Sequence, residues 1–369
     1  MREYTKDDYG WFCLDSINEI SLYKKIKIAV LLENGSKLFE IEKYENELST
    51  ILEDSEIVIL KTKISEKNIE KLLKPTFSRG VDFITLNSPE YPKELYDCPV
   101  PPFILYYKGD IGLLKTNAIA IVGSRIHTKY GEVVTENFAK ELSQNGFTIV
   151  SGLAEGLDGI AQSTCLKVGG KTIAVLCGGL DKIYPAINVG LADEILKNGG
   201  LLITEQQVGV SAQKYMFPIR NRLMAYFSKG VLLTEASEHS GTKHTINHAL
   251  DANRSVYCIP GSILNSRGNY GNILIKTCQS LIVLSPKDIV EDLGFKFKDK
   301  QAINDIEIKS EIDDVGLIRE ILSEDEYVHF EKILEKSKMD IKKLNSLLTK
   351  LEISGIIKKM AGNFYMLCK

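Results

Sequence analysis

The sequence predicts an α/β protein whose largest part is a parallel sheet with helices on both faces. Three observations carry this prediction. Apolar runs of strand length alternate with helical segments from Ala118 to about Gly294, glycines follow nearly every run, and the flanking segments have a mostly helical pattern. Such alternation is typical of an extended Rossmann-like parallel sheet. We therefore expect this sheet together with an N-terminal helical domain and a C-terminal winged-helix domain.

The composition places limits on location and partners. The chain has 369 residues, of which 44% are hydrophobic and 26% charged, and its formal net charge is only -3, so any contact with nucleic acid has to be local. Its seven cysteines are scattered without a C-x-x-C pair, which argues against a disulfide framework or a thiolate zinc site. No secretory signal or bilayer-length apolar stretch is apparent, so we expect a cytoplasmic protein without membrane insertion.

The first 117 residues divide into two parts. Residues 1–75 have helical spacing with a break at Asn34-Gly35, and they predict a small helical, SAM-like domain. Residues 76–117 predict a connector into the core, with strand-like runs at 82–86 and 103–110 and a proline-rich passage at 99–102.

Residues 118–294 predict the Rossmann-like domain. Its first helix is indicated by Val134, Phe138 and Leu142, which share one helix face and are followed by Gly146. The expected strands are the apolar runs 118–122, 148–150, 172–176, 201–204, 231–234, 256–259 and 281–284.

The C-terminal residues have a different pattern. A polar linker is expected at 295–313, and residues 314–369 predict three short helices followed by two strands around Gly362. This order is typical of a winged helix.

Glycine-rich loops at the ends of the strands predict a phosphate site. The carboxyl ends of parallel strands meet at one edge, where ligands bind, and glycine together with helix N-termini suits an anion there. A different interpretation is that the glycines only permit tight turns, but five such loops on one edge favour binding. The loops contain Gly123-Ser124-Arg125, Gly152, Gly178-Gly179, Ser240-Gly241 and Gly261.

A second concentration of candidate residues is the run from Phe217 to Arg222. Pro218 suits the first turn of a helix, and two arginines with an aromatic ring are typical of a platform for single strands, with guanidinium groups on phosphates and the ring on a base. In the alternative interpretation Phe217 belongs to the core, and the arginines pair with Glu205 and Glu235.

These motifs, taken in chain order, closely resemble those of the DNA-processing A (Smf) family. The resemblance rests on the glycine loops named above, on Tyr184-Pro185, on Phe217-Pro218-x-Arg220-Asn221-Arg222, on Ser240-Gly241-Thr242 and on Pro260-Gly261. The sequence departs from the family pattern at Gln162, Ala186, Gln206-Gln207, Lys243 and His244.

The resemblance implies a non-enzymatic recombination mediator that has no cofactor. It would bind and protect incoming single-stranded DNA during natural transformation, form a homodimer through the Rossmann-like domain, and help to load the RecA recombinase. The residues that match the DNA-contact motifs are Gly123, Ser124, Arg125, Phe217, Arg220, Asn221, Arg222, Ser240 and Gly241, and Gly152 and Lys243 complete the predicted DNA-binding set.

Some features of the sequence suggest other functions. His239, His244 and His248 suggest a metal site, but such residues on a helix are more often exposed, and we predict no metal. The serious alternative is a nucleotide-binding or nucleotide-hydrolysing enzyme related to the phosphoribohydrolases, although Thr245 occupies the place of their catalytic glutamate. Gly123-Ser124-Arg125 also does not continue as the G-x-G-x-x-G of dinucleotide-dependent oxidoreductases.

Overall fold

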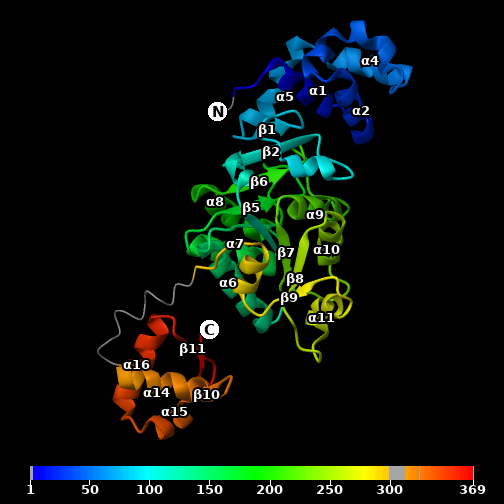
Figure 1. Ribbon diagram of the computed structural model, residues 1–369. Coiled ribbons are helices and arrows are strands. Elements are labelled where there is room, and N and C mark those ends of the chain that lie inside the picture. The colour runs from blue at the N-terminus through cyan, green and yellow to red at the C-terminus, as the bar shows by residue number, and fades with distance from the viewer. Residues whose placement is uncertain (1–2, 299–311, 324, 369) are drawn as a thin grey trace. The chain divides into compact units, whose positions relative to one another are not determined.

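The computed structural model describes residues 3–298, 312–323 and 325–368. The chain forms two compact units, Met1–Phe297 and Lys298–Lys369, each with its own core (Figure 1). Residues 299–311, which make up most of the predicted linker 295–313, lie outside the described residues.

Residues 6–77 are mainly helical. Helix α1 begins at Thr5, whose side chain and that of Asp8 cap each other's backbone amides. The helices pack around a hydrophobic core that includes Trp11 and Leu38. This core extends to the sheet, where Tyr106 of the second strand belongs to it. Their bounds are α1 Lys6–Asp15, α2 Leu22–Leu32, η1 Gly35–Tyr44, α3 Glu45–Leu48, α4 Asp54–Lys63 and α5 Glu66–Phe77.

A nine-stranded sheet forms the centre of the first unit, in the order β1-β2-β6-β5-β4-β3-β7-β8-β9. Neighbouring strands from β6 to β9 in this order are parallel, which confirms the predicted fold class. The strands are β1 Asp82–Thr85, β2 Ile104–Gly109, β3 Ala118–Val122, β4 Thr148–Ser151, β5 Thr172–Val175, β6 Leu201–Thr204, β7 Gly230–Leu233, β8 Ser255–Cys258 and β9 Leu281–Ile282.

The segment expected to be a connector adds two strands to this sheet. Strand β2 pairs antiparallel with β6, and β1 pairs antiparallel with β2. Ile104 and Tyr106 of β2 pack in the core that the N-terminal helices share with the sheet, and Leu105 and Tyr107 pack in a second core. This burial of its side chains favours pairing of the run over a free loop. The proline-rich passage 99–102 lies in the loop between the two strands.

Helices cover both faces of the sheet (Figure 1). Alternation along β3 divides its side chains, because Ile119 and Ile121 pack with α6 and α7, while Ala120 and Val122 pack with α9 and α10. The helices are α6 Lys129–Gln144, α7 Leu157–Lys167, α8 Val189–Lys197, α9 Met216–Tyr226, α10 Thr242–Asp251, α11 Asn269–Lys276 and α12 Pro286–Asp292, with short 3-10 turns η2 Lys93–Asp97, η3 Ile111–Lys115, η4 Ala186–Asn188 and η5 Ser266–Gly268.

The N-terminal helices are joined to the sheet by hydrogen bonds to Asp15. Its carboxylate accepts from the hydroxyl of Tyr106 at 2.6 Å and from the side-chain amide of Gln207 at 2.9 Å. The ammonium group of Lys25 donates to the Asp15 carbonyl at 2.7 Å. These bonds connect α1 and α2 to β2 and to the loop after β6.

The second unit has the element order of a winged helix. Its elements are α14 Ile312–Ser323, β10 Val328–His329, α15 Phe330–Ser337, α16 Ile341–Ile353, β11 Ile357–Met360 and β12 Phe364–Leu367, and the strands form a sheet in the order β10-β12-β11. The core of this unit includes Ile318, Ile333 and Leu348. None of the helices in the described ranges of the chain combines the length and apolar character that a membrane span requires.

Candidate functional site

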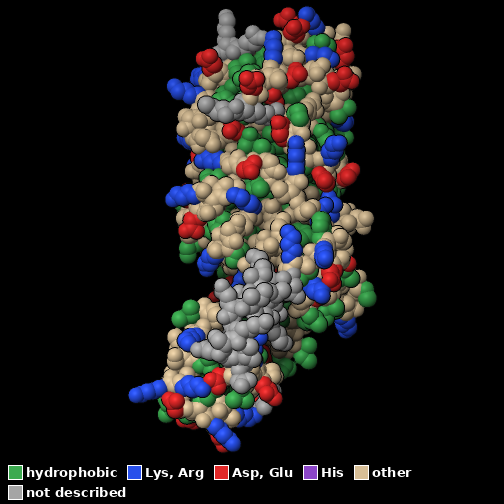
Figure 2. Space-filling model, turned by 60° about the vertical axis from the view of Figure 1, so that its left-hand side comes forward, with side chains coloured by type: hydrophobic (Ala, Val, Ile, Leu, Met, Phe, Trp, Pro, Cys, Tyr) green, Lys and Arg blue, Asp and Glu red, His purple; other side chains and the backbone are tan. Residues whose placement is uncertain are grey.

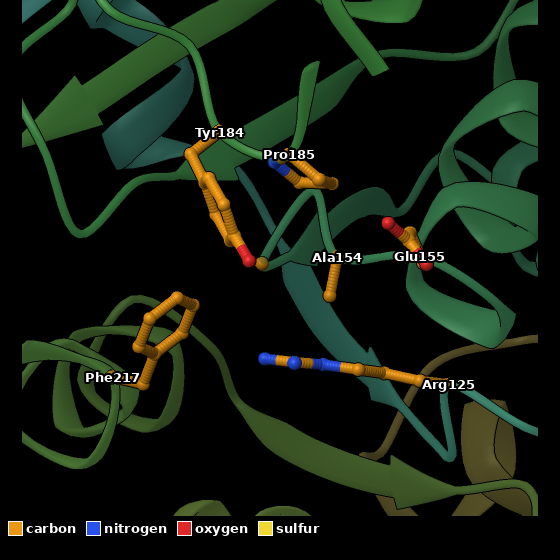
Figure 3. A pocket seen from close by; sticks show the side chains of 7 residues that line it. Arg125, Ala154, Glu155, Tyr184, Pro185 and Phe217 are labelled. Carbon is orange, nitrogen blue, oxygen red and sulfur yellow. The ribbon is translucent and has the colours of Figure 1, made fainter. Parts of the chain in front are cut away.

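A small pocket opens at the carboxyl edge of the sheet. Loops after β3, β4 and β5 and the first turn of α9 build its walls, so segments far apart in the sequence meet there (Figure 3). Its free volume is about 10 Å³, room for about one water molecule. The lining residues are Arg125, Gly152, Ala154, Glu155, Tyr184, Pro185 and Phe217.

An exposed arginine and two aromatic rings dominate this pocket. The guanidinium carbon of Arg125 lies 5.3 Å from the centroid of the Phe217 ring, a cation–π contact. The Phe217 and Tyr184 rings meet edge to face with their centroids 5.8 Å apart (Figure 3). Tyr184 precedes Pro185 through a cis peptide bond and is half exposed. The pocket therefore offers a positive charge directly beside aromatic surface.

Glu235 fixes the loop that carries Arg125. The backbone amide of Ser124 donates to the Glu235 carbonyl at 2.8 Å, and the amide of Thr128 donates to the Glu235 carboxylate at 2.8 Å. The Ser124 hydroxyl donates to the Ile126 carbonyl at 2.7 Å. Ser124 thus shapes the loop through its own hydrogen bonds, and the Arg125 side chain remains exposed.

Arg220 lies beneath the pocket, where it is almost fully buried. Its Nη1 donates to the carbonyl of Gly152 at 2.8 Å and also to the carbonyl of Val175. Asp158 accepts from the Gly152 amide at 3.1 Å, and burial raises the pKa of this carboxyl although Arg220 and the neighbouring amides oppose the shift. Arg220 therefore holds the ends of β4 and β5 in place and does not present its charge at the surface.

Arg222 makes a buried ion pair with Glu205. Its Nη1 and Nη2 donate to the two carboxylate oxygens at 2.7 and 2.6 Å. Burial alone would lower the pKa of Arg222, but the Glu205 carboxylate raises it. The pair joins α9 to the end of β6, and the structure does not bring Arg222 to the pocket of Arg125.

At the carboxyl edge of the sheet, glycine is required at some positions and not at others. A Cβ atom on Gly123 would lie 2.6 Å from a methyl group of Leu157, so this position requires glycine for the approach of α7. A Cβ on Gly152 would lie 2.7 Å from the Arg220 guanidinium and 2.8 Å from Asp158. In contrast, Gly241 is exposed and has open space around its Cα.

The first turn of α10 lies next to the Arg125 loop, since the Thr242 hydroxyl donates to the Gly123 carbonyl at 3.3 Å. The amides of Thr242 and Lys243 donate to Ser240, so these amides are already satisfied. Asn221 makes a long contact of 3.5 Å to the carbonyl of Gly241. Lys243 is exposed on this turn and does not line the pocket.

The structure thus brings Arg125, Gly152 and Phe217 together and places the other predicted residues around or beneath them. Sequence reasoning did not include Tyr184, Pro185, Ala154 or Glu155 among the site residues. Tyr184-Pro185 directly follows a glycine-rich loop and was the available signal. Ala154 and Glu155 lie between Gly152 and Gly156 in the glycine-rich loop that follows β4, and this loop was the available signal for them.

Charge at the site is local. On the face drawn in Figure 2, Lys and Arg side chains are interspersed with Asp and Glu and do not gather in one basic patch. Within the described part of the chain, no group of three or more His, Cys, Asp or Glu side chains is arranged to hold a metal ion. One ring nitrogen of His248 lies 3.2 Å from the Pro218 carbonyl, so this ring contacts the backbone of α9.

The fold and the pocket define a Rossmann-like binding protein with an exposed arginine and aromatic rings at the ligand-binding edge of its sheet. The family model of DNA recombination-mediator protein A matches residues 82–294, more than half of the sequence. The chain belongs to this family, which confirms the resemblance inferred from the motifs.

Relatives and solved structures agree with this assignment. The chain is 36% identical to DNA processing protein DprA of Bacillus subtilis over 67% of its own length and 84% of the relative, and 34% identical to protein Smf of Escherichia coli over 82% and 81%. The X-ray structure of DprA from Streptococcus pneumoniae matches 80% of this chain and 100% of its own, with 30% identity and a TM-score of 0.66.

A structure of DNA processing protein A from Helicobacter pylori, described for its single-stranded DNA binding mode, matches with 32% identity and a TM-score of 0.52. The match covers 57% of this chain and 95% of the other. The function of this chain is therefore that of a DNA-processing recombination mediator.

Proposed function

We propose that the chain acts as a mediator by binding single-stranded DNA at the pocket of Arg125, Tyr184 and Phe217. The observation that carries the proposal is the exposed Arg125 guanidinium, 5.3 Å from the centroid of the Phe217 ring. Single-stranded DNA presents a phosphate next to a flat base, and positive charge beside aromatic rings is how proteins bind both.

The geometry supports a division of tasks among these residues. Arg125 would donate to a phosphate, and a base would lie on the exposed part of Tyr184 or Phe217, because a pocket of about 10 Å³ cannot enclose a base without movement. The amides of Thr242 and Lys243 in the first turn of α10 already donate to Ser240. Arg125 would therefore make the main electrostatic contribution to binding of the phosphate. Gly241 and Lys243 are exposed next to the Arg125 loop, and they would contact the bound DNA farther along its backbone.

The test is fluorescence anisotropy of a labelled oligothymidine at several salt concentrations. We expect Arg125→Ala to raise the dissociation constant by about tenfold, since a charge-assisted hydrogen bond contributes about 1.5 kcal/mol. The slope of log K against log salt should decrease by about 0.7, the value for one phosphate contact on a single strand.

Lys140→Ala is the control, because Lys140 is an exposed cation near the other end of α6 from the pocket. It should leave the affinity nearly unchanged. If Arg125→Ala binds with the same affinity and the same salt slope as the wild type, the site is elsewhere. If a mononucleotide binds or is hydrolysed and the oligothymidine does not bind, the nucleotide-enzyme alternative replaces this proposal.

The location, the absence of catalysis and the RecA partner are proposed from the resemblance to the family. We propose a cytoplasmic, non-enzymatic protein that helps to load RecA onto the bound strand. All seven cysteines are free thiols, in keeping with a reducing compartment. The buried Asp158 lies against the Gly152 amide and is shielded from a ligand, which supports a structural role over acid–base chemistry.

We also propose a homodimer formed through the Rossmann-like domain. Strand β9 is the last strand of the sheet, and apolar side chains on this strand, just after it and in the loop that follows β8 are exposed. An edge strand with apolar neighbours is a favourable surface for a second chain. The exposed side chains are Ile263, Leu264, Leu281, Ile282 and Leu284.

A further inference from the structure

A second pocket lies across the first turn of α9 from the first one. Phe217 lines the first pocket, whereas Tyr215 and Ile219, each two residues away along the helix, line the second. The second pocket has a free volume of about 90 Å³, room for several water molecules. Its lining consists of Leu176, Cys177, Thr204, Glu205, Gln206, Tyr215, Met216, Ile219 and Arg220.

The two pockets share a wall. Arg220 lines the second pocket, and its guanidinium donates to the carbonyl of Gly152, which lines the first. The second pocket also lies at the carboxyl edge of the sheet, because Cys177 follows β5 and Gln206 follows β6. Single-stranded DNA bound at Arg125 would therefore continue over the N-terminus of α9, where the helix dipole favours negative charge.

The walls of the second pocket suit a flat, polar and uncharged group. Tyr215 is 66% exposed and Ile219 is 49% exposed, so both leave apolar surface open to a ligand. Among the described residues, the side-chain amide of Gln206 makes no hydrogen bond, and this group can both donate and accept.

The charged groups that line the second pocket already make hydrogen bonds within the protein. Both carboxylate oxygens of Glu205 accept from Arg222, and the Arg220 guanidinium donates to backbone carbonyls. Burial raises the pKa of the Cys177 thiol, so this group is neutral as well. Among the residues that line this pocket no cation is free to bind a phosphate, which makes a nucleobase the better occupant.

We propose that the second pocket is a subsite for another base of the same single strand, stacked on Tyr215 and hydrogen-bonded to Gln206. This inference rests on the proposed function, and it adds that the strand crosses the N-terminus of α9 with bases on both sides. Because an amide can donate or accept, the subsite would take any of the bases without strong sequence preference.

The experiment compares two probes of equal charge, a labelled oligothymidine and a labelled oligomer of abasic sites of the same length. Alanine substitution of a residue that stacks on one base costs about 5- to 100-fold in affinity. We expect Tyr215→Ala to weaken oligothymidine binding by such a factor without changing the salt slope, and to leave binding of the abasic oligomer within about twofold. Tyr215→Phe should retain the wild-type affinity because it keeps the ring.

Tyr23→Ala is the matched control, since Tyr23 is a 67% exposed tyrosine on α2. Thermal unfolding of each variant checks that the fold is intact. If Tyr215→Ala binds oligothymidine like the wild type while Arg125→Ala does not, the subsite is refuted and the first pocket stands. If the wild-type protein does not bind oligothymidine, the proposed function fails, and the subsite fails with it.

Discussion

Arg125, Arg220 and Arg222 all belong to the predicted DNA-binding set, but only Arg125 has an exposed side chain. Arg220 donates to the carbonyls of Gly152 and Val175, and Arg222 is paired with Glu205. The alternative interpretation of the sequence, in which arginines of this run pair with acidic residues, therefore describes Arg222. The three arginines differ in their burial and in the groups to which they donate hydrogen bonds. Neither property can be predicted from the spacing of arginines in the sequence.

Gly152 provides a test of this arrangement at the scale of one residue. A methyl group at this position would lie 2.7 Å from Arg220 and 2.8 Å from Asp158. We expect Gly152→Ala to lower the free energy of unfolding by about 1–3 kcal/mol, as overpacking does in a filled interior. Chemical denaturation measures this change.

Gly241→Ala is the comparison for Gly152→Ala, since a Cβ on Gly241 meets nothing within 4 Å. Its φ angle is -60°, a conformation that alanine adopts freely. The stability of this variant should equal that of the wild type. If both variants unfold alike, the packing around Gly152 is looser than the structure indicates.

Helix α9 is held at two points along its length, by Arg220 at the ends of β4 and β5 and by Arg222 at the end of β6. These anchors fix the turn that carries Phe217 and Tyr215. Removing one partner of a buried ion pair leaves the other uncompensated. The helix is therefore positioned by buried charges whose hydrogen bonds are made within the protein.

A double-mutant cycle on Arg222 and Glu205 tests this anchor. We expect Arg222→Met to lower the free energy of unfolding by about 3 kcal/mol, the lower part of the range for broken buried pairs, because the Glu205 side chain is 14% exposed. Adding Glu205→Leu should recover most of the loss. If the double variant is as unstable as the sum of the two single variants, the residues are not coupled.

The elements of the parallel sheet could be predicted because each strand is a short apolar run bounded by glycine or polar residues. The strand predicted at 118–122 coincides with β3, and the expected helix face of Val134, Phe138 and Leu142 lies in α6. Strands β1 and β2 were expected only as runs within a connector, because antiparallel pairing to β6 depends on which segments meet in space.

The candidate site could be predicted in part for a similar reason. Arg125 lies in a loop and Phe217 in the first turn of α9, both at the predicted edge of the sheet, so the topology brings them near each other. The position of Tyr184 against Phe217 depends on the path of the loop after β5, which no local pattern specifies.

At the scale of the whole molecule, the proposed interface is the edge of the sheet at β9, where Leu281, Ile282 and Leu284 are exposed. Leu264 is 93% exposed and Ile263 is 86% exposed, and both follow β8, the strand that pairs with β9. A second chain that covered these residues would remove both the open strand edge and the apolar surface from water.

The proposed homodimer is tested by the variant that carries Leu264→Glu and Ile282→Glu. We expect it to sediment as a monomer at concentrations where the wild type is a dimer, because two buried carboxylates without partners oppose association. Val58→Glu on α4 is the control, since Val58 is an exposed apolar residue of the N-terminal helices. Unchanged sedimentation of the double variant would place the interface elsewhere.

The burial of Arg220 and Arg222 has a consequence for how descent and activity are recognised in such chains. Both arginines hold α9 against the sheet, so a descendant that had lost DNA binding would still gain stability by keeping them. Selection on the ligand would act instead on the exposed Arg125 and Tyr215. Arg220 and Arg222 would therefore record ancestry, and the exposed Arg125 and Tyr215 would record whether the proposed DNA binding survives.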